Sequence, residues 1–450
     1  MAESTETIEK EIAEREAQEK REARRKRRQT NQALAYMTLL MLVMLVAVAV
    51  VFLIHFIKIS KPVSEKPQSS VDQSAIGDMI GEEEELTIPE ETETVVELTP
   101  EQKLDAIIDE AVISVMPLED KVAGLFIVTP ESITGVDIAI KAGDGTKEAL
   151  NKWAVGGVIY FDQNIKSEEQ FKEMVSNTAL YSRYPIFTCM DEEGGKVSRL
   201  AKKNLVDNVG SAGSIGETGD AANALAAGKY VSAYMMEYGL NVNFAPVADI
   251  RNAEGSYIGE RAYSSDVAVT AAMVSASVTG LKENKVSACL KHFPGIGSST
   301  EDTHVGLAIS ERTLEEFRAE EFTVFKAGID AGADFVMVSH MSAPALTGDN
   351  TPCSLSPTVV TDYLRGELGF DGVIITDAMN MGAITEYKEA DEAAILALKA
   401  GCDMILMPDD YEKAYNGVLQ AVKDGTISEE RINDSLRRIY RIKYADKLPE

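Results

Sequence analysis

The chain has 450 residues, of which 45% are hydrophobic, and its 73 acidic side chains outnumber its 44 basic ones, giving a formal charge of −29 at pH 7. A surface with this excess of negative charge repels nucleic acid, so nucleic acid is excluded as a partner. The four cysteines lie far apart and three of them stand inside apolar runs, so we expect small core residues and neither a disulfide framework nor a zinc site.

The amino-terminal part of the chain predicts a membrane anchor. Residues 1–32 form a charged, cytoplasmic segment that contains the basic run KREARRKRR, and the apolar residues 33–57 are long enough to span a bilayer. Because basic residues stay on the cytoplasmic side, we predict a single-pass cell-membrane protein whose remaining chain is extracellular. No small-residue cleavage site is evident, which favours an anchor that is retained in the lipid bilayer.

Residues 58–102 contain prolines, serines and the run EEEE, with little periodic apolar character. This composition is typical of a disordered, self-repelling linker, which would hold a folded domain away from the membrane. The folded domain is therefore predicted to occupy residues 103–450.

Eight short apolar runs within that domain alternate with longer segments of helical character. Buried parallel strands alternate with helices in this way, and eight such units predict an α/β fold of the closed (β/α)8, or TIM-type, barrel class. The eight predicted strands are GLFIV, GGVIYF, PIFTCMDEEGG, NVNFAPVADI, VSACLKHFPG, DFVMVSHM, DGVIITDAM and CDMILMP.

Three of the intervening segments have clear helical periodicity. They begin near Ser167, Ala221 and Ser310, and in the third Thr313 is followed by two glutamates, a pattern that suits the start of a helix.

Polar residues follow five of the predicted strands at the point where the apolar run ends. In a barrel these positions all face the end at which active sites are built, so we expect a functional site there. The residues are Asp191, Asp249, Lys291 with His292, His340, and Asp377.

Several reaction classes fit these residues poorly. A zinc hydrolase needs closely spaced ligands, and the chain has neither HxH nor HExxH. The sequence also lacks the GxSxG motif of many serine hydrolases and the GxxxxGK[ST] motif of a phosphate-binding loop.

Glycoside hydrolysis fits better, because it requires a carboxylate beside the anomeric carbon and a proton donor beside the leaving oxygen. Asp377, at the end of an apolar strand, can supply a rigid carboxylate. Asp302 and His304 are two residues apart, so in an extended loop both side chains point to the same side and the acid can orient the imidazole. Such a pair can donate and then accept a proton.

The motifs KHFPG, DTH, DEEGGKVSRL, IGERAYSSD, NFAPVADI and LSPTVVTDYLRGELGFDGVIITDAMNMGAI together resemble glycoside hydrolase family 3, in its single-domain branch of β-N-acetylglucosaminidases. The resemblance extends from about residue 121 to 409. It implies that Asp377 is the nucleophile of a retaining mechanism, that His304 is the general acid/base, and that Asp302 is the partner of His304.

The resemblance also implies a substrate site and a biological setting. Sugar hydroxyl and acetamido groups would be held by Asp191, Arg199, Arg261, Lys291 and His292, with no metal or organic cofactor. The expected reaction removes terminal β-linked N-acetylglucosamine, and the predicted outward orientation suggests cell-wall (peptidoglycan) fragments such as muropeptides as the amino-sugar substrate.

Two positions depart from the pattern of the branch. Ile296 stands between two glycines where a histidine is usual, and Lys196 stands where an arginine is frequent. Neither belongs to the nucleophile or the acid/base pair, so we expect them to affect substrate preference.

Four further polar residues have a structural interpretation beside the functional one. Asp249 is expected to fix a loop, and Glu192 and Glu193 to satisfy backbone donors or to pair with Arg199. For His340 the sequence leaves open whether it lines the pocket or closes a hydrogen bond in the core.

Three alternatives to the hexosaminidase hypothesis remain at this point. A β-glucosidase of the same family usually carries a second domain, for which too few residues follow the eighth strand. A phosphorylase would use the same residues with phosphate as acceptor. A catalytically silent, membrane-anchored wall-binding protein would retain the barrel only to bind sugar.

Overall fold

The computed structural model describes residues 99–252, 255–299 and 308–445. The predicted cytoplasmic segment, the predicted anchor at 33–57 and nearly all of the predicted linker lie outside these ranges. Across the described residues, no helix is both long enough and apolar enough to cross a membrane.

Eight parallel strands close into a barrel in the order β1-β10-β9-β8-β7-β6-β3-β2, which confirms the predicted barrel fold. Each of the eight predicted apolar runs contributes one strand. Seven strands are buried along their whole length, while β9 is partly exposed at its carboxyl end. The strands are β1 (Phe126–Val128), β2 (Gly157–Ile159), β3 (Phe187–Met190), β6 (Val242–Asn243), β7 (Ser287–Phe293), β8 (Phe335–Val338), β9 (Val373–Ala378) and β10 (Met404–Leu406).

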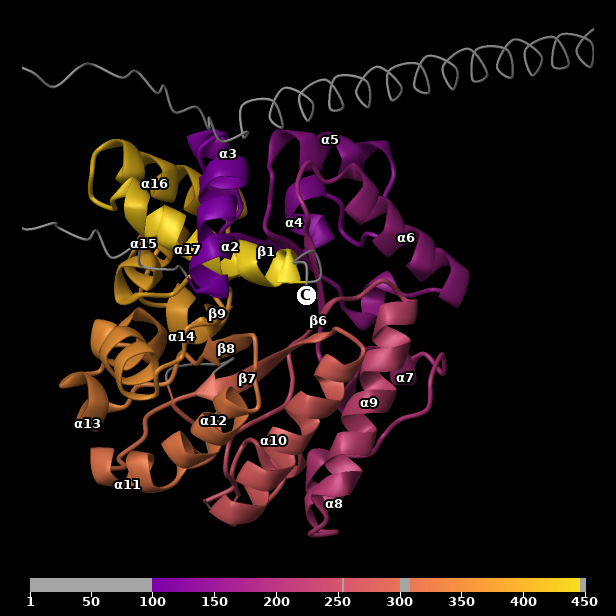
Figure 1. Cartoon of the computed structure of the whole chain (residues 1–450), viewed down its shortest axis with the longest axis vertical. Coiled ribbons are helices and arrows are strands. Elements are labelled where there is room, and N and C mark those ends of the chain that lie inside the picture. Colours follow the sequence, from indigo (N-terminus) through magenta and orange to yellow (C-terminus); the bar gives the residue numbers. More distant parts are fainter. Residues whose placement is uncertain (1–98, 253–254, 300–307, 446–450) are drawn as a thin grey trace, which may run out of the picture. The chain divides into compact units, whose positions relative to one another are not determined.

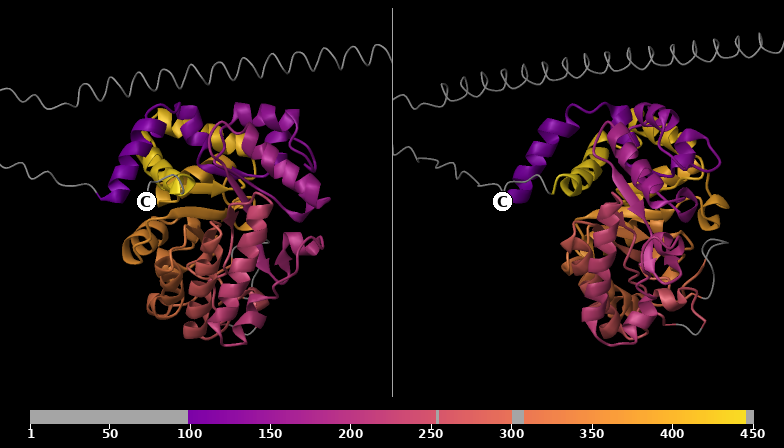
Figure 2. Two further views of the ribbon diagram at one scale, coloured as in Figure 1. Left: turned by 45° about the vertical axis from the view of Figure 1, so that its right-hand side comes forward. Right: turned by 90° about the vertical axis from the view of Figure 1, so that its right-hand side faces the viewer.

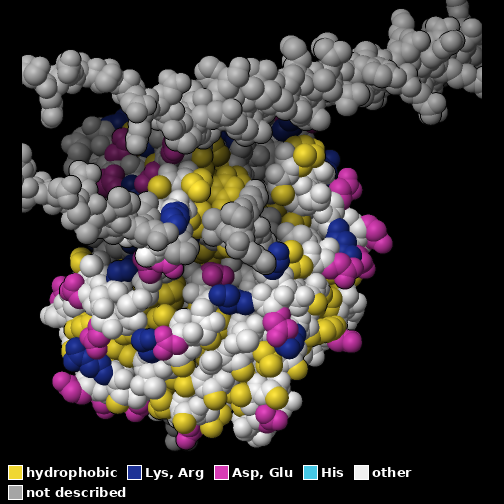
Figure 3. Space-filling view, viewed as in Figure 1, with side chains coloured by type: hydrophobic (Ala, Val, Ile, Leu, Met, Phe, Trp, Pro, Cys, Tyr) yellow, Lys and Arg dark blue, Asp and Glu magenta, His cyan; other side chains and the backbone are white. Residues whose placement is uncertain are grey.

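Helices surround the strands (Figures 1 and 2). Helix α10 packs between α9 and α12, and α15 packs against α16. Acidic and basic side chains are interspersed with apolar ones over the face shown in Figure 3. The α-helices are α2 (Pro100–Ile108), α3 (Leu118–Ala123), α4 (Pro130–Thr134), α5 (Asp144–Lys152), α6 (Glu168–Tyr181), α7 (Arg199–Lys202), α8 (Ala212–Gly216), α9 (Ala221–Glu237), α10 (Val267–Glu283), α11 (Leu314–Ala319), α12 (Glu321–Asp330), α13 (Pro344–Thr347), α14 (Gly382–Thr385), α15 (Ala390–Ala400), α16 (Tyr411–Lys423) and α17 (Glu429–Lys443).

The predicted helix starts agree with the structure. Ser167 caps α6, and Thr313 caps α11 in a reciprocal pair with Glu316. The third predicted helical segment is divided at Glu320, whose backbone leaves the helical region and whose carboxylate lies 2.8 Å from the guanidinium of Arg312.

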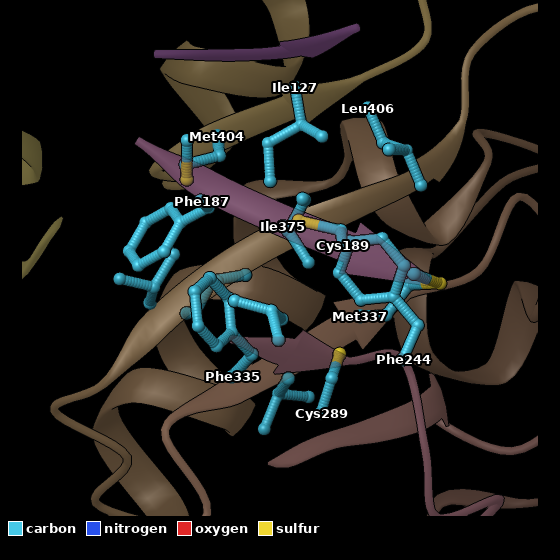
Figure 4. Packing of buried hydrophobic residues seen from close by; sticks show 14 of the residues in the cluster. Ile127, Phe187, Cys189, Phe244, Cys289, Phe335, Met337, Ile375, Met404 and Leu406 are labelled. Carbon is cyan, nitrogen blue, oxygen red and sulfur yellow. The ribbon is translucent and has the colours of Figure 1, made fainter. Parts of the chain in front are cut away.

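The barrel interior is filled by large apolar side chains from different strands (Figure 4). The rings of Phe187 and Phe335 meet edge to face with their centres 5.2 Å apart. Cys189 and Cys289 lie in the same interior, and all four cysteines are free thiols buried in the core, as the sequence predicted.

At the amino end of the barrel the last turn of α17 places a partly buried lysine beneath the strands. The Nζ atom of Lys443 donates to the Gly156 carbonyl over 3.0 Å and lies 4.7 Å from the centre of the Phe187 ring. Burial lowers the pKa of this ammonium group to about 7.

Candidate active site

A pocket of about 740 Å³ opens at the carboxyl end of the barrel strands. Residues from the ends of β2, β7, β8, β9 and β10 form its floor, and the segments after β3 and β6 form its walls. Its polar lining residues include Asp191, Glu193, Lys196, Arg199, Glu260, Arg261, Lys291, His292 and Asp377. The structure therefore brings together the predicted nucleophile and all five predicted sugar-binding residues.

A network of ion pairs crosses one wall of this pocket. Lys291 Nζ, at the end of β7, lies 2.9 Å from Asp191 Oδ1 and 2.6 Å from Glu193 Oε1. Asp191 also receives Arg199 Nη2 at 3.0 Å. Glu193 receives Nε and Nη2 of Arg261, both at 2.8 Å, in a bidentate pair. The chain thus fixes three cations on two carboxylates.

The charges of this network keep both carboxylates ionised. Burial opposes ionisation of Asp191, but the positive charges of Lys291 and Arg199 outweigh it and hold its pKa well below the usual value. Burial opposes ionisation of Glu193 in the same way, and Lys291 and Arg261 lower its pKa to about 2. At neutral pH the wall therefore presents fixed donors and acceptors to a bound hydroxyl group.

Asp377 lies near the carboxyl end of β9 and is partly buried in the pocket lining. Its Oδ1 accepts the amide of Ala378 over 2.8 Å. Burial works to raise the pKa of this carboxyl, but His292 and His340 together with the Ala378 amide lower it below its ordinary value. An ionised carboxylate at this position is suited to act as a nucleophile.

His292 is held from behind by Asp249. The Nδ1 of His292 lies 2.7 Å from Asp249 Oδ2, which also accepts the His292 amide over 3.1 Å. Because Asp249 can only accept, Nδ1 carries the hydrogen and Nε2 faces Arg261 Nη2 at 3.4 Å. The second oxygen of Asp249 accepts the amide of Ile296 over 2.7 Å, which confirms that Asp249 fixes a loop.

The adjacent acids Glu192 and Glu193 serve opposite faces of the hairpin formed by β4 (Glu192–Gly194) and β5 (Val197–Ser198). Glu192 points away from the pocket and accepts the backbone amides of Arg199 and Leu200, and burial raises its pKa to about 7. This role matches the predicted one. For Glu193 the predicted pairing with Arg199 is wrong, because Glu193 lies on the same side as Asp191 and meets Lys291 and Arg261 there.

His340, for which the sequence left two interpretations, lies fully buried behind the pocket. Its Nδ1 lies 2.8 Å from Ser354 Oγ and its Nε2 lies 3.1 Å from the carbonyl of Ala378. The structure therefore favours the core hydrogen-bonding role, directly beside the residue that follows Asp377.

Asp302 and His304 lie outside the described residues, so their predicted roles remain predictions. The segments that flank them meet, since Ser298 Oγ lies 3.1 Å from Ser310 Oγ. In the parts of the chain that the structure describes, no group of three or more His, Cys, Asp or Glu side chains is arranged to hold a metal ion.

Comparison with known proteins shows that the chain is similar to enzymes that cleave sugars. The family model described as "Glycosyl hydrolase family 3 N terminal domain" matches residues 117–442. A beta-hexosaminidase of Stenotrophomonas maltophilia is 36% identical over 279 residues, which cover 60% of this chain and 82% of that protein.

Two solved structures are similar over most of the barrel. A glycoside hydrolase family 3 beta-N-acetylglucosaminidase from a Paenibacillus species has a TM-score of 0.69 and 32% identity, covering 74% of this chain. The chain spans 64% of the length of that enzyme. A glycosyl hydrolase family 3 member from Mycobacterium smegmatis has a TM-score of 0.66 and 28% identity, covering 73% of this chain and 98% of the other.

Proposed function

Since this chain belongs to glycoside hydrolase family 3, we propose that it is a retaining glycosidase that releases terminal β-linked N-acetylglucosamine. The observation that carries the proposal is the position of Asp377, an ionised carboxylate at the end of a barrel strand, in one pocket with a fixed network of ion-paired donors and acceptors. The similarity to a beta-hexosaminidase and to a beta-N-acetylglucosaminidase supports the choice of sugar.

In the proposed first step the Asp377 carboxylate attacks the anomeric carbon of the bound sugar. A bond forms between a carboxylate oxygen and that carbon while the bond to the leaving-group oxygen breaks. The leaving oxygen takes a proton from the imidazolium form of His304, which Asp302 orients, and a neutral imidazole remains. A covalent glycosyl-enzyme and a free leaving group result.

In the proposed second step water replaces Asp377. The imidazole of His304, now without the proton it gave, accepts one from the water as the water oxygen attacks the anomeric carbon. The bond to Asp377 breaks, and the two inversions retain the configuration of the sugar. The neutral imidazole carries no charge toward Asp377, which distinguishes it from a second carboxylate at this place.

The ion-paired wall supplies the binding energy in this scheme. Asp191 can accept from sugar hydroxyls, while Arg199 and Lys291 can donate to them. Because each of the three already holds a partner at 3.0 Å or less, little side-chain freedom is lost when sugar binds.

We extend the proposal to the location of the enzyme. Residues 33–57 would anchor the chain in the membrane with the basic run before them in the cytoplasm, so the barrel would face cell-wall fragments. Protease added to intact spheroplasts should degrade the barrel domain. Protection until the cells are lysed would contradict this orientation.

The activity is tested with the full chain and an aryl β-N-acetylglucosaminide. We expect release of the aryl group, its loss in Asp377→Ala, and, in His304→Ala, accumulation of a protein species carrying the mass of one N-acetylglucosaminyl group on Asp377. Faster cleavage of an aryl β-glucoside would overturn the choice of sugar. Formation of a sugar 1-phosphate on addition of phosphate would replace hydrolysis by phosphorolysis.

A further inference from the structure

Arg199 is held differently from the other two cations of the ion-paired wall. Lys291 meets two carboxylates, and Arg261 makes a bidentate pair with one of them. Arg199 donates to Asp191 through Nη2 alone, over 3.0 Å, and its buried Nε has no hydrogen-bond partner among the described residues. A single contact to a carboxylate leaves a guanidinium group free to turn, so a second contact is needed to fix its orientation.

The second contact is the aromatic ring of Phe161, which follows strand β2 and lines the pocket. The Cζ atom of Arg199 lies over this ring, 5.2 Å from its centre. The negative potential of an aromatic face attracts a guanidinium group, and the attraction is stronger where little water screens it. The Arg199 side chain is 17% exposed, so this contact is largely shielded from solvent.

The backbone that carries Phe161 is closed into a short loop. The Phe161 amide donates to Asn164 Oδ1 over 2.8 Å, and the Asn164 amide donates to the Phe161 carbonyl over 3.0 Å. The side-chain amide of Asn164 also donates to Glu131 and to the Ala139 carbonyl, over 2.6 and 2.8 Å, which ties this loop to the segment that follows β1. The ring of Phe161 is therefore presented to Arg199 from a rigid support.

We propose that Phe161 is a positioning residue for Arg199, whose guanidinium group it holds against Asp191 in the orientation that receives the sugar. The inference rests on the proposed function and adds a residue to the part of the site that binds sugar. Without the attraction of the ring, Arg199 turns freely in the empty pocket and is immobilised each time sugar binds. Immobilising one long side chain weakens binding by about two- to tenfold. Because the ground state and the transition state lose the same contact, KM rises and kcat is unchanged.

The first test weakens the attraction while the shape of the ring is kept. Phenylalanine analogues with one, two or three fluorine atoms, placed at position 161 of the full chain, lower the negative potential of the ring face step by step with little change in volume. The KM for the aryl β-N-acetylglucosaminide should rise with each fluorine, reaching about two- to tenfold for the trifluoro analogue, at unchanged kcat. Phe161→Leu, which removes the ring, should raise KM by a similar factor.

The second test separates an effect through Arg199 from a direct contact between the ring and the sugar. The rise in melting temperature that N-acetylglucosamine causes reports binding even in a variant without turnover, at concentrations high enough to saturate it. With Arg199 intact, the trifluoro analogue should weaken this binding by the same factor as KM. In an Arg199→Ala background the analogue should have no further effect.

The matched control is Phe370, whose ring lies 5.6 Å from the Cζ atom of Arg365 and stands outside the pocket lining. The fluorinated analogues at position 370 should leave KM unchanged. A KM that stays constant through the series at position 161, or an equal weakening of binding in Arg199→Ala, would overturn this inference alone. Failure of the wild type to cleave the aryl β-N-acetylglucosaminide would instead overturn the proposed function.

Discussion

Replacing Glu193 by glutamine tests whether the buried ion network supports the site. The Glu193 side chain is 4% exposed, and its carboxylate contacts Lys291 Nζ and the Nε and Nη2 atoms of Arg261. These charges lower its pKa from 4.5 to about 2, and at about 1.4 kcal/mol per pH unit this corresponds to about 3 kcal/mol in favour of the ionised form in the folded protein. Glutamine cannot ionise, so Glu193→Gln should lower the free energy of unfolding by about 3 kcal/mol at pH 7.

The direction of the pKa shift of Glu193 determines how the stability difference between wild type and Glu193→Gln depends on pH. A carboxyl group with a lowered pKa stabilises the folded state above its unfolded-state pKa of about 4.5 and loses this contribution as the pH falls toward 2. The difference between wild type and Glu193→Gln should therefore be full above pH 4.5 and shrink below it. Urea unfolding followed by the fluorescence of Trp153, the one tryptophan of the chain, measures this difference.

The matched control is Glu283→Gln, because Glu283 makes a 2.7 Å ion pair with Lys229 in which the two side chains are 46% and 43% exposed. Such an exposed pair contributes at most about 1 kcal/mol. If half of the 3 kcal/mol lost in Glu193→Gln also weakens substrate binding, kcat/KM falls about tenfold, mainly through a higher KM. An unfolding free energy for Glu193→Gln equal to that of Glu283→Gln would refute the reasoning.

Three further predictions concern other parts of the molecule. In the wild type, Lys443 binds a proton on unfolding between pH 7 and 10.5, so the free energy of unfolding should rise with pH in that range. Lys443→Met should reduce this slope by up to about 1.4 kcal/mol per pH unit in urea titrations at several pH values, and an unchanged slope would contradict the prediction. His340→Ala should lower the free energy of unfolding by about 2 to 4 kcal/mol and also lower kcat, since the Ser354 hydroxyl and the Ala378 carbonyl lose their partner. His340→Gln should recover part of the stability, measured by calorimetry, and part of kcat, measured in single-turnover assays. Asn208→Ala should lower the free energy of unfolding by about 1 kcal/mol, because the amide and the carbonyl of Gly195 lose their partner; an unchanged urea midpoint would show that the hairpin needs no such support.

The barrel could be predicted from the sequence because its strands are short, apolar and buried on both faces. Such strands leave a local signal that does not depend on their partners. Even β6, only two residues long, was evident from the apolar run around it. The positions of Asp191, Lys291 and His292 at the pocket could be predicted for the same reason, since they stand at the ends of strands and all parallel strands end at the same edge of the barrel. Arg199 and Arg261 stand in other segments, and only the resemblance to family motifs indicated them.

The partners of these residues could not be predicted, because ion pairing depends on distances between segments far apart in the chain. Glu193 meets Lys291 across the barrel mouth, and nothing local in either segment indicates that contact. The helical segment is divided at Glu320, whose carboxylate pairs with Arg312 before the start of the helix, and helix propensity gives no sign of this contact. Lys443 belongs to a charged helix whose pattern gives no sign that its last turn closes the amino end of the barrel.

Ile296 shows why a departure from a family pattern can leave a site intact. Its side chain is 4% exposed and packs in the core, while its backbone amide donates to Asp249, the same carboxylate that holds His292. The next residue, Gly297, has no room for a side chain, because a Cβ there would lie 1.7 Å from the Ile250 carbonyl oxygen. The base of the loop is therefore fixed by a backbone hydrogen bond and a glycine, neither of which depends on the side chain at position 296. A histidine there would add its own polar contacts, but the connection between Asp249 and His292 that orients the pocket is already made without it.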